Sequence, residues 1–208
     1  MHDRLTLVDW RRRIFALYEE VRASADPEEA WERWRAVRND LFRGHPQSPL
    51  PEEDREAFAG LPFFDYDPAA RVLAEVSEAP AEHYDIQTSG DGTYGFTRFA
   101  NARFDLDGTP VVLELYWLDG YSGGLFVPFR DATAGRESYG AGRYLLDTVK
   151  GADLGTDGDR LLLDFNFSYN PSCAYDPRWV CPLAPPPNRI DVEIRAGERA
   201  PRAKPQSP

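Results

Sequence analysis

Most side chains that could do chemistry lie in the second half of the sequence, and we predict that six of them line a ligand pocket. They supply a carboxylate, a guanidinium, two phenols and two amides, groups that hydrogen-bond to the polar edges of small molecules. In a loop, the same amides and phenols also satisfy the loop's own backbone, and that structural alternative stays open. The six residues are Glu114, Tyr139, Arg143, Asn166, Tyr169 and Asn170.

Glu114 stands out because it interrupts the stretch VVLELYWL (residues 111–118), in which both faces of a strand would otherwise be apolar. Burial of Glu114 would raise its pKa, and an arginine partner, Arg98 or Arg143, would lower it again. Such a pair is either a structural ion pair or an anchor for a ligand. An outward-facing Glu114 is the third alternative. We interpret Asp131, in the sequence DATAG, as part of a turn.

The two cysteines, Cys173 and Cys181, allow several kinds of chemistry. In a reducing compartment they are thiols, but their separation also permits a small disulfide loop, for which the chain-entropy model gives roughly 2.6 kcal/mol. A nucleophilic Cys173 would need a base or a cation nearby, and His83 is the only histidine in the strand region. A zinc site would need two further ligands, and His2, His45 and His83 are scattered, so we predict no metal site.

Both cysteines lie in residues 164–188, DFNFSYNPSCAYDPRWVCPLAPPPN. A stretch so rich in proline forms neither a regular helix nor a central strand, because proline removes backbone donors and fixes φ. An ordered loop of this kind usually closes a core or lines a site. We therefore expect it to cover the mouth of the β domain.

The N-terminal part of the chain predicts a helical hairpin. A first helix over residues 6–21 places Trp10, Ile14, Leu17 and Val21 on one stripe. A second helix starts with Asp26 as N-cap and ends at Gly44, and a short third helix is expected over residues 51–59.

From residue 63 onward the apolar periodicity changes to two, which is typical of strands. We expect about eight, in an antiparallel barrel or sandwich, so the fold class is mainly β (α+β). The predicted division is a helical segment (1–60) packed on the core, an antiparallel β domain with the Pro-rich loop (61–198) and a disordered tail (199–208). The predicted strands are 71–76, 84–87, 93–106, 111–118, 125–131, 143–146, 161–167 and 191–194.

The composition limits the partners. A net charge of −11 makes nucleic acid and anionic membranes unlikely to bind, because both need a surplus of Lys and Arg. The sequence has no apolar run near 18 residues, and no secretory signal is visible, so we expect no membrane association and a cytoplasmic location. It predicts neither a cofactor nor an oligomeric state.

Two long blocks carry a resemblance to a known family. The blocks LFVPFRDATAGRESYGAGRYL (residues 125–145) and DFNFSYNPSCAYDPRWVCPLAPPPNR (164–189), together with HPQSPL (45–50), resemble a prokaryotic family known as the domain of unknown function numbered 1684. The resemblance implies no reaction, cofactor or substrate. Its pattern points to Asp131, Thr133, Gly135, Tyr139, Gly142, Arg143, Asp164, Asn166, Tyr169, Asn170, Cys173 and Cys181.

Our leading hypothesis is a small-molecule binding protein with a pocket in the β domain, because small barrels often hold one ligand. The alternative is an enzyme that acts on a small substrate through a buried Glu/Arg pair or through Cys173. A structural or partner-binding module is the third alternative.

Overall fold

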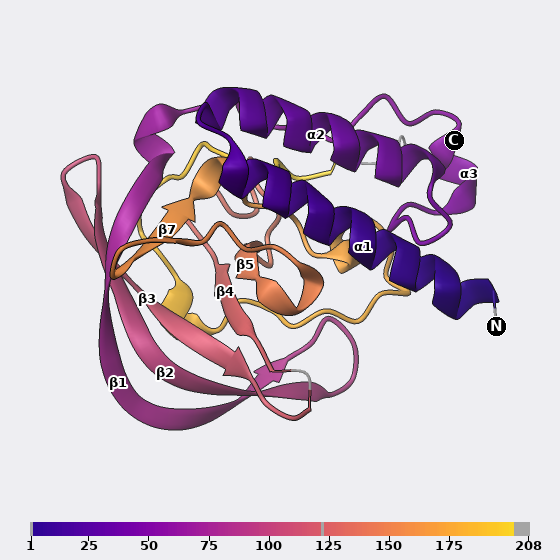
Figure 1. Cartoon of the computed structure of the whole chain (residues 1–208). Coiled ribbons are helices and arrows are strands. Elements are labelled where there is room, and N and C mark those ends of the chain that lie inside the picture. Colours follow the sequence, from indigo (N-terminus) through magenta and orange to yellow (C-terminus); the bar gives the residue numbers. More distant parts are fainter. Residues whose placement is uncertain (1, 122, 202–208) are drawn as a thin grey trace.

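The computed structural model describes residues 2–121 and 123–201, in which a helical pair packs on one antiparallel sheet (Figure 1). The helices are α1 (His2–Ala23), α2 (Pro27–Gly44) and α3 (Glu52–Arg55), with 3-10 helices η1 (Pro68–Ala70), η2 (Thr148–Lys150), η3 (Phe165–Phe167), η4 (Ser172–Ala174) and η5 (Pro186–Asn188). The strands are β1 (Arg71–Gln87), β2 (Thr93–Leu106), β3 (Thr109–Leu118), β4 (Leu125–Phe129), β5 (Arg143–Asp147), β6 (Thr156–Asp157) and β7 (Arg160–Asp164). This confirms the prediction of a mainly antiparallel β fold with an N-terminal helical hairpin.

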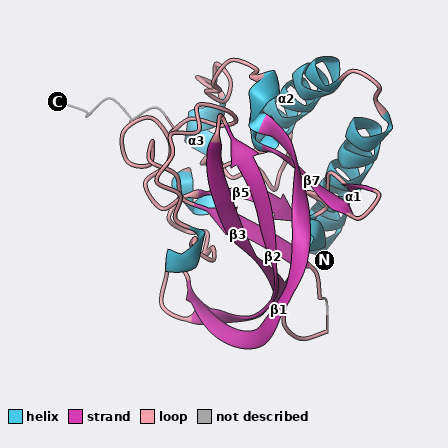
Figure 2. Ribbon diagram, turned by 90° about the vertical axis from the view of Figure 1, so that its left-hand side faces the viewer, coloured by secondary structure: helices cyan, strands magenta, loops and turns pink. Residues whose placement is uncertain are grey.

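The seven strands lie in the order β5-β4-β3-β2-β1-β7-β6, and every neighbouring pair is antiparallel. Because β5 and β6 lie at its two edges, the sheet is open and does not close into a barrel. Its long strands are nevertheless strongly curved, as β1 and β2 show in Figure 2. The curvature gives the sheet a concave face on which the helices and loops pack.

Strand β1 runs unbroken through a region where the sequence predicts two strands, 71–76 and 84–87. Its register against β2 shifts between Glu78 and Glu82, on either side of Pro80. A proline cannot donate to the ladder, and a bulge bends the strand that carries it. The proline therefore bends the strand instead of ending it.

The predicted strand over residues 191–194 is wrong. The N–H of Ile194 donates to the carboxylate of Asp131, and its carbonyl accepts from Arg143, so side chains take the place of a neighbouring strand. Arg199 and Ala200, the first two residues of the predicted disordered tail, donate backbone hydrogen bonds to the carbonyls of Pro62 and Glu137. Residues 202–208 lie outside the described residues.

The helical pair is held by a buried aromatic face of α2. Asp26 accepts from the N–H groups of Glu28 and Glu29, as the N-cap prediction requires. Trp34 is fully buried, and Trp31 donates from Nε1 to the carbonyl of Asn166 at 3.0 Å. These contacts fix α2, and through it α1, on the loop that follows β7.

The core has two parts. The larger cluster joins the helices to the sheet and includes Trp34, Leu113, Leu145 and Phe165. A second, smaller cluster packs separately at the end of the sheet where β3 meets β4: Ile86, Phe96, Tyr116, Phe126 and Tyr144. In the described part of the chain, no helix has the length and apolar character needed to cross a membrane.

Candidate functional site

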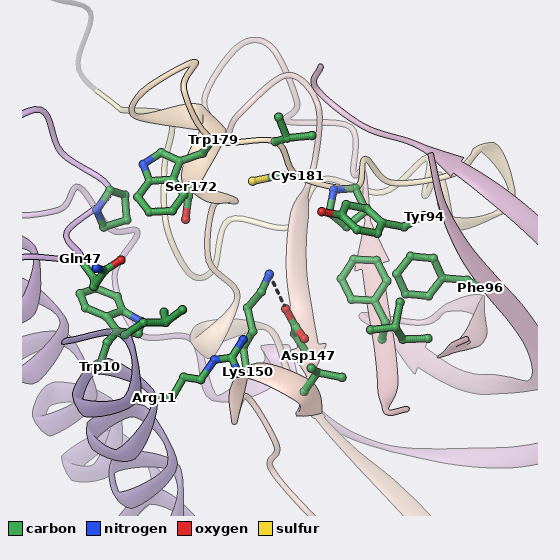
Figure 3. A pocket seen from close by; sticks show the side chains of 17 residues that line it. Trp10, Arg11, Gln47, Tyr94, Phe96, Asp147, Lys150, Ser172, Trp179 and Cys181 are labelled. Atoms are coloured by element: carbon green, nitrogen blue, oxygen red, sulfur yellow. Dashed lines mark ion pairs between the residues drawn. The ribbon is translucent and has the colours of Figure 1, made fainter. Parts of the chain in front are cut away.

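A cavity of about 300 Å³ lies beside the smaller cluster, and we call it the outer cavity (Figure 3). Its walls come from α1, the loop after α2, the strands β2 to β5, η2 and the cysteine loop, which we define as residues 171–183. Tertiary packing brings these distant segments together, so the cavity exists only in the folded chain.

Most of the cavity wall is apolar. Phe96 and Phe126 stack with their ring centroids 4.9 Å apart and form the floor with Leu118. Trp10 of α1 and Trp179 of the cysteine loop supply further aromatic surface. A wall of this kind favours the flat or aliphatic body of a small molecule.

A charged pair lies at one side of the cavity. The ammonium of Lys150 lies 3.1 Å from a carboxylate oxygen of Asp147. Partial desolvation beside the cavity disfavours the charged form of Lys150, but the charge of Asp147 and its hydrogen bond outweigh that effect, so the pKa of Lys150 lies above its ordinary value. The lysine side chain is 55% exposed and is therefore available to a ligand.

Arg11 adds a second cation to the same cavity. It is exposed, and within the described residues it forms no ion pair. Gln47, by contrast, is held in place by hydrogen bonds to Asp3 and Thr6. With Asp147 already paired to Lys150, the surplus charge beside the cavity is positive.

The cysteine loop is tied to the sheet by Ser89, which follows β1. The Ser89 hydroxyl donates to the carbonyl of Trp179 and accepts from the N–H of Cys181, both at 3.1 Å. The Ser89 N–H donates to the carbonyl of Cys181 at 2.9 Å. The Tyr144 hydroxyl donates to the carbonyl of Pro182. The Pro-rich segment thus lines a cavity, which is one of the two roles that we considered for it, but the sheet is open and has no barrel mouth to cover.

Both cysteines of this loop are free thiols in the structure. Cys181 is buried and lines the outer cavity, whereas Cys173 is half-buried and its Sγ lies 3.9 Å from the hydroxyl of Tyr139. A hydrogen bond from Cys181, with a further one from Tyr139, outweighs burial and lowers the pKa of Cys173 to about 6. The same hydrogen bond, together with burial, raises the pKa of Cys181.

A smaller cavity of about 80 Å³, the inner recess, adjoins the outer cavity and shares Trp10, Pro49, Lys150 and Ser172 with it. Tyr169 and Asn170, two of the six predicted site residues, line this recess.

Arg143 lies in the protein interior, away from both cavities. Its guanidinium donates to the carboxylate of Asp131 and to the carbonyls of Ile194, Ala196 and Glu198. Asp131 also accepts from the N–H and hydroxyl of Thr133, which agrees with our interpretation of Asp131 as a turn residue. Arg143 therefore holds the C-terminal segment in place.

Glu114 pairs with Arg98, one of its two predicted arginine partners, at 3.0 Å. Its other carboxylate oxygen accepts from the Tyr116 hydroxyl at 2.6 Å. The backbone of Glu114 is bridged to β4 by the Asn188 side chain, which donates to the carbonyls of Glu114 and Pro128. Glu114 lines neither cavity.

Asn166 is fully buried and satisfies the chain around it. Its side chain donates to the carbonyl of Asp67 and to the carboxylate of Asp164, and it accepts from the N–H of Asp67. The structure therefore does not bring the six predicted residues together: Tyr169 and Asn170 share the inner recess, Tyr139 lies beside Cys173, and Asn166, Arg143 and Glu114 lie elsewhere.

The sequence analysis missed the residues that line the outer cavity, above all Arg11, Asp147 and Lys150. One feature pointed to Lys150: the chain has only two lysines, and this is the one within the β domain. The Arg38–Glu198 ion pair, which is buried between α2 and the C-terminal segment, was also missed.

Two other regions are weaker candidates. An open groove of about 990 Å³ runs between α1 and α2, but charged side chains along it are paired with each other, as Arg13 with Asp9 and Arg33 with Glu20. Within residues 2–121 and 123–201, no group of three His, Cys, Asp or Glu side chains could hold a metal ion. His83 hydrogen-bonds to Asp119 on the exposed surface.

Comparisons with known proteins give a family and a related structure. The family described as "Protein of unknown function (DUF1684)" matches residues 56–199. The solution NMR structure of an uncharacterized protein from Haloarcula marismortui is 40% identical, with a TM-score of 0.60, and the match covers 83% of this chain and 93% of that chain. No curated protein matches. Because the family match spans more than half of the sequence, the chain belongs to the DUF1684 family.

Proposed function

We propose that this protein binds a small molecule that has an apolar body and an anionic group, and that the outer cavity is its binding site. The observation that carries the proposal is the cavity itself, about 300 Å³ in volume, walled by aromatic side chains and lined by the cysteine loop. Ligand pockets in proteins begin at about this size and have this mixed lining.

The apolar body is inferred from the wall. Phe96, Phe126 and Trp10 line the cavity, and apolar surface makes up the larger part of its wall. Burial of an apolar ligand against such a wall gives about 25 cal/mol per Å² of surface removed from water.

The anionic group is inferred from charge. Lys150 and Arg11 outnumber the single carboxylate of Asp147, which the lysine neutralises. An acidic ligand group gains from both cations, whereas a cationic group would have only Asp147 as a partner. The net charge of −11 supports a small molecule over nucleic acid. A cytoplasmic location stays a prediction.

The test uses two fluorescent probes that share one ring system. The first is 8-anilinonaphthalene-1-sulfonate, which is anionic, and the second is N-phenyl-1-naphthylamine, which lacks the sulfonate. We expect Arg11→Met to weaken binding of the anionic probe about threefold to fivefold, which is the loss expected for one partly exposed charge. The affinity for the neutral probe should not change.

Arg12→Met is the matched control, because Arg12 is the next residue on α1, is exposed and does not line the cavity. Equal weakening of both probes by Arg11→Met, or the same effect from Arg12→Met, would contradict the charge argument. Failure of both probes to bind the wild-type protein at micromolar concentration would contradict the cavity as a binding site.

A further inference from the structure

The search for further sites leads back to the cysteine loop, where two thiols meet at the edge of the outer cavity. Cys181 lines the cavity, Cys173 follows the lining residue Ser172, and the Cys181 side chain is a hydrogen-bond partner of the Cys173 sulfur. The backbone of Cys181 is fixed by two hydrogen bonds with Ser89. The two cysteines are therefore held in place, and their contact does not require the motion of a flexible loop.

The surroundings make the two thiols unequal. Cys173 accepts hydrogen bonds, including one from the Tyr139 hydroxyl, and these favour its thiolate. Cys181 is the donor of the shared hydrogen bond, which together with burial raises its pKa. Histidine does not activate Cys173, because His83, the only histidine of the strand region, pairs with Asp119 and Asp85. An attacking thiolate beside a resolving thiol is the arrangement of a redox-active dithiol.

We propose that Cys173 and Cys181 form a reactive dithiol that low-molecular-weight disulfides oxidise to an intramolecular disulfide. The Cys173 thiolate attacks one sulfur of the small disulfide RSSR, forms a mixed disulfide and releases RS⁻. The Cys181 thiol then loses its proton and attacks the Cys173 sulfur of that mixed disulfide, and the second RS⁻ leaves. The two thiol protons of the protein end on two molecules of RSH, and the two electrons that the cysteines lose reduce the small disulfide.

The proposal does not depend on what the outer cavity binds. It does predict that oxidation alters the cavity, because the Cys181 sulfur leaves the lining when it pairs with Cys173. The site is thus a modification site on the wall of a binding site.

The first experiment uses the wild-type protein alone. Oxidised glutathione is added at pH 7, and the intact mass is measured without reductant. The expected product is a protein about 2 Da lighter, with no glutathione attached, because resolution by Cys181 removes the adduct. A stable glutathione adduct on the wild-type protein would overturn the proposal. An unchanged mass after prolonged incubation with excess oxidised glutathione would also overturn it.

Variants assign the two roles. Cys181→Ser should stop at one glutathione adduct on Cys173, because the resolving thiol is missing. Alkylation of Cys173 by iodoacetamide, followed over pH, should have its midpoint well below the value near 8.5 that the urea-unfolded chain gives. Tyr139→Phe should move that midpoint upward, since it removes a donor from the thiolate. Tyr121→Phe, at a fully exposed tyrosine, is the control. A midpoint in the folded protein equal to that of the unfolded chain would also refute the assignment.

Discussion

Two ion pairs of this protein, Arg143 with Asp131 and Lys150 with Asp147, use the same chemistry in opposite ways. Both partners of the first pair are almost fully buried, and the guanidinium donates to three carbonyls besides Asp131. In the second pair the lysine is 55% exposed and faces the outer cavity. A charge enclosed by its hydrogen-bond partners holds the fold, whereas a charge with an exposed side is available to a ligand.

The largest expected effect is on the buried pair. Arg143→Met leaves the Asp131 carboxylate buried without its cation and three carbonyls without a donor. We expect it to lower the free energy of unfolding by about 3 to 5 kcal/mol, measured by urea denaturation. A loss below about 1 kcal/mol would contradict the structural role of Arg143.

The second prediction concerns pH. Burial raises the pKa of Asp164 to about 6, against hydrogen bonds from Asn166 and the charge of Arg71, which lower it. The carboxyl therefore ionises at higher pH in the folded than in the unfolded chain, so its contribution to stability is present below about pH 4 and is lost as the pH rises through about 6.

Asp164→Asn should remove that loss. Its free energy of unfolding relative to the wild type should rise between pH 4 and pH 7, by on the order of 2 kcal/mol. Asp159→Asn, at an exposed residue, serves as the control. A difference between Asp164→Asn and wild type that stays constant over this range would refute the effect of burial on Asp164.

The smallest effect on stability is expected at the cavity pair. Lys150→Met should lower the free energy of unfolding by about 1 kcal/mol, well below the effect of Arg143→Met, because the lysine of this pair is 55% exposed although Asp147 is buried. It should nevertheless weaken binding of 8-anilinonaphthalene-1-sulfonate by about fivefold or more, since it removes a cation and leaves Asp147 unpaired. Asp147→Asn should change the affinity in the opposite direction and strengthen binding of the anionic probe. If Lys150→Met and Asp147→Asn changed the affinity for the anionic probe in the same direction, the distinction between the two ion pairs would be wrong.

The fold could be predicted where the physics is local. The N-cap at Asp26 and the turn at Asp131 depend on residues close in sequence, and both are as predicted. Strand β1 could not be predicted as one element, because its continuity past Pro80 depends on pairing with β2.

The candidate site was predicted only in part for the same reason. The loop around Cys173 and Cys181 was recognised from its composition, and the structure places it against a cavity. Arg11 and Lys150 come from an amphipathic helix and a short 3-10 turn, and only the tertiary packing of these elements brings them to that loop. Of the six predicted residues, Arg143 and Asn166 instead hold buried segments in place.

The most direct test of the outer cavity is an NMR titration of ¹⁵N-labelled protein with 8-anilinonaphthalene-1-sulfonate. We predict that the amide shifts change most for Phe96, Phe126, Lys150 and Cys181, which surround the cavity. The main competing surface is the exposed side of the sheet, where Trp117 and Phe99 are in contact. Shift changes confined to that side, or to the groove between α1 and α2, would contradict the account.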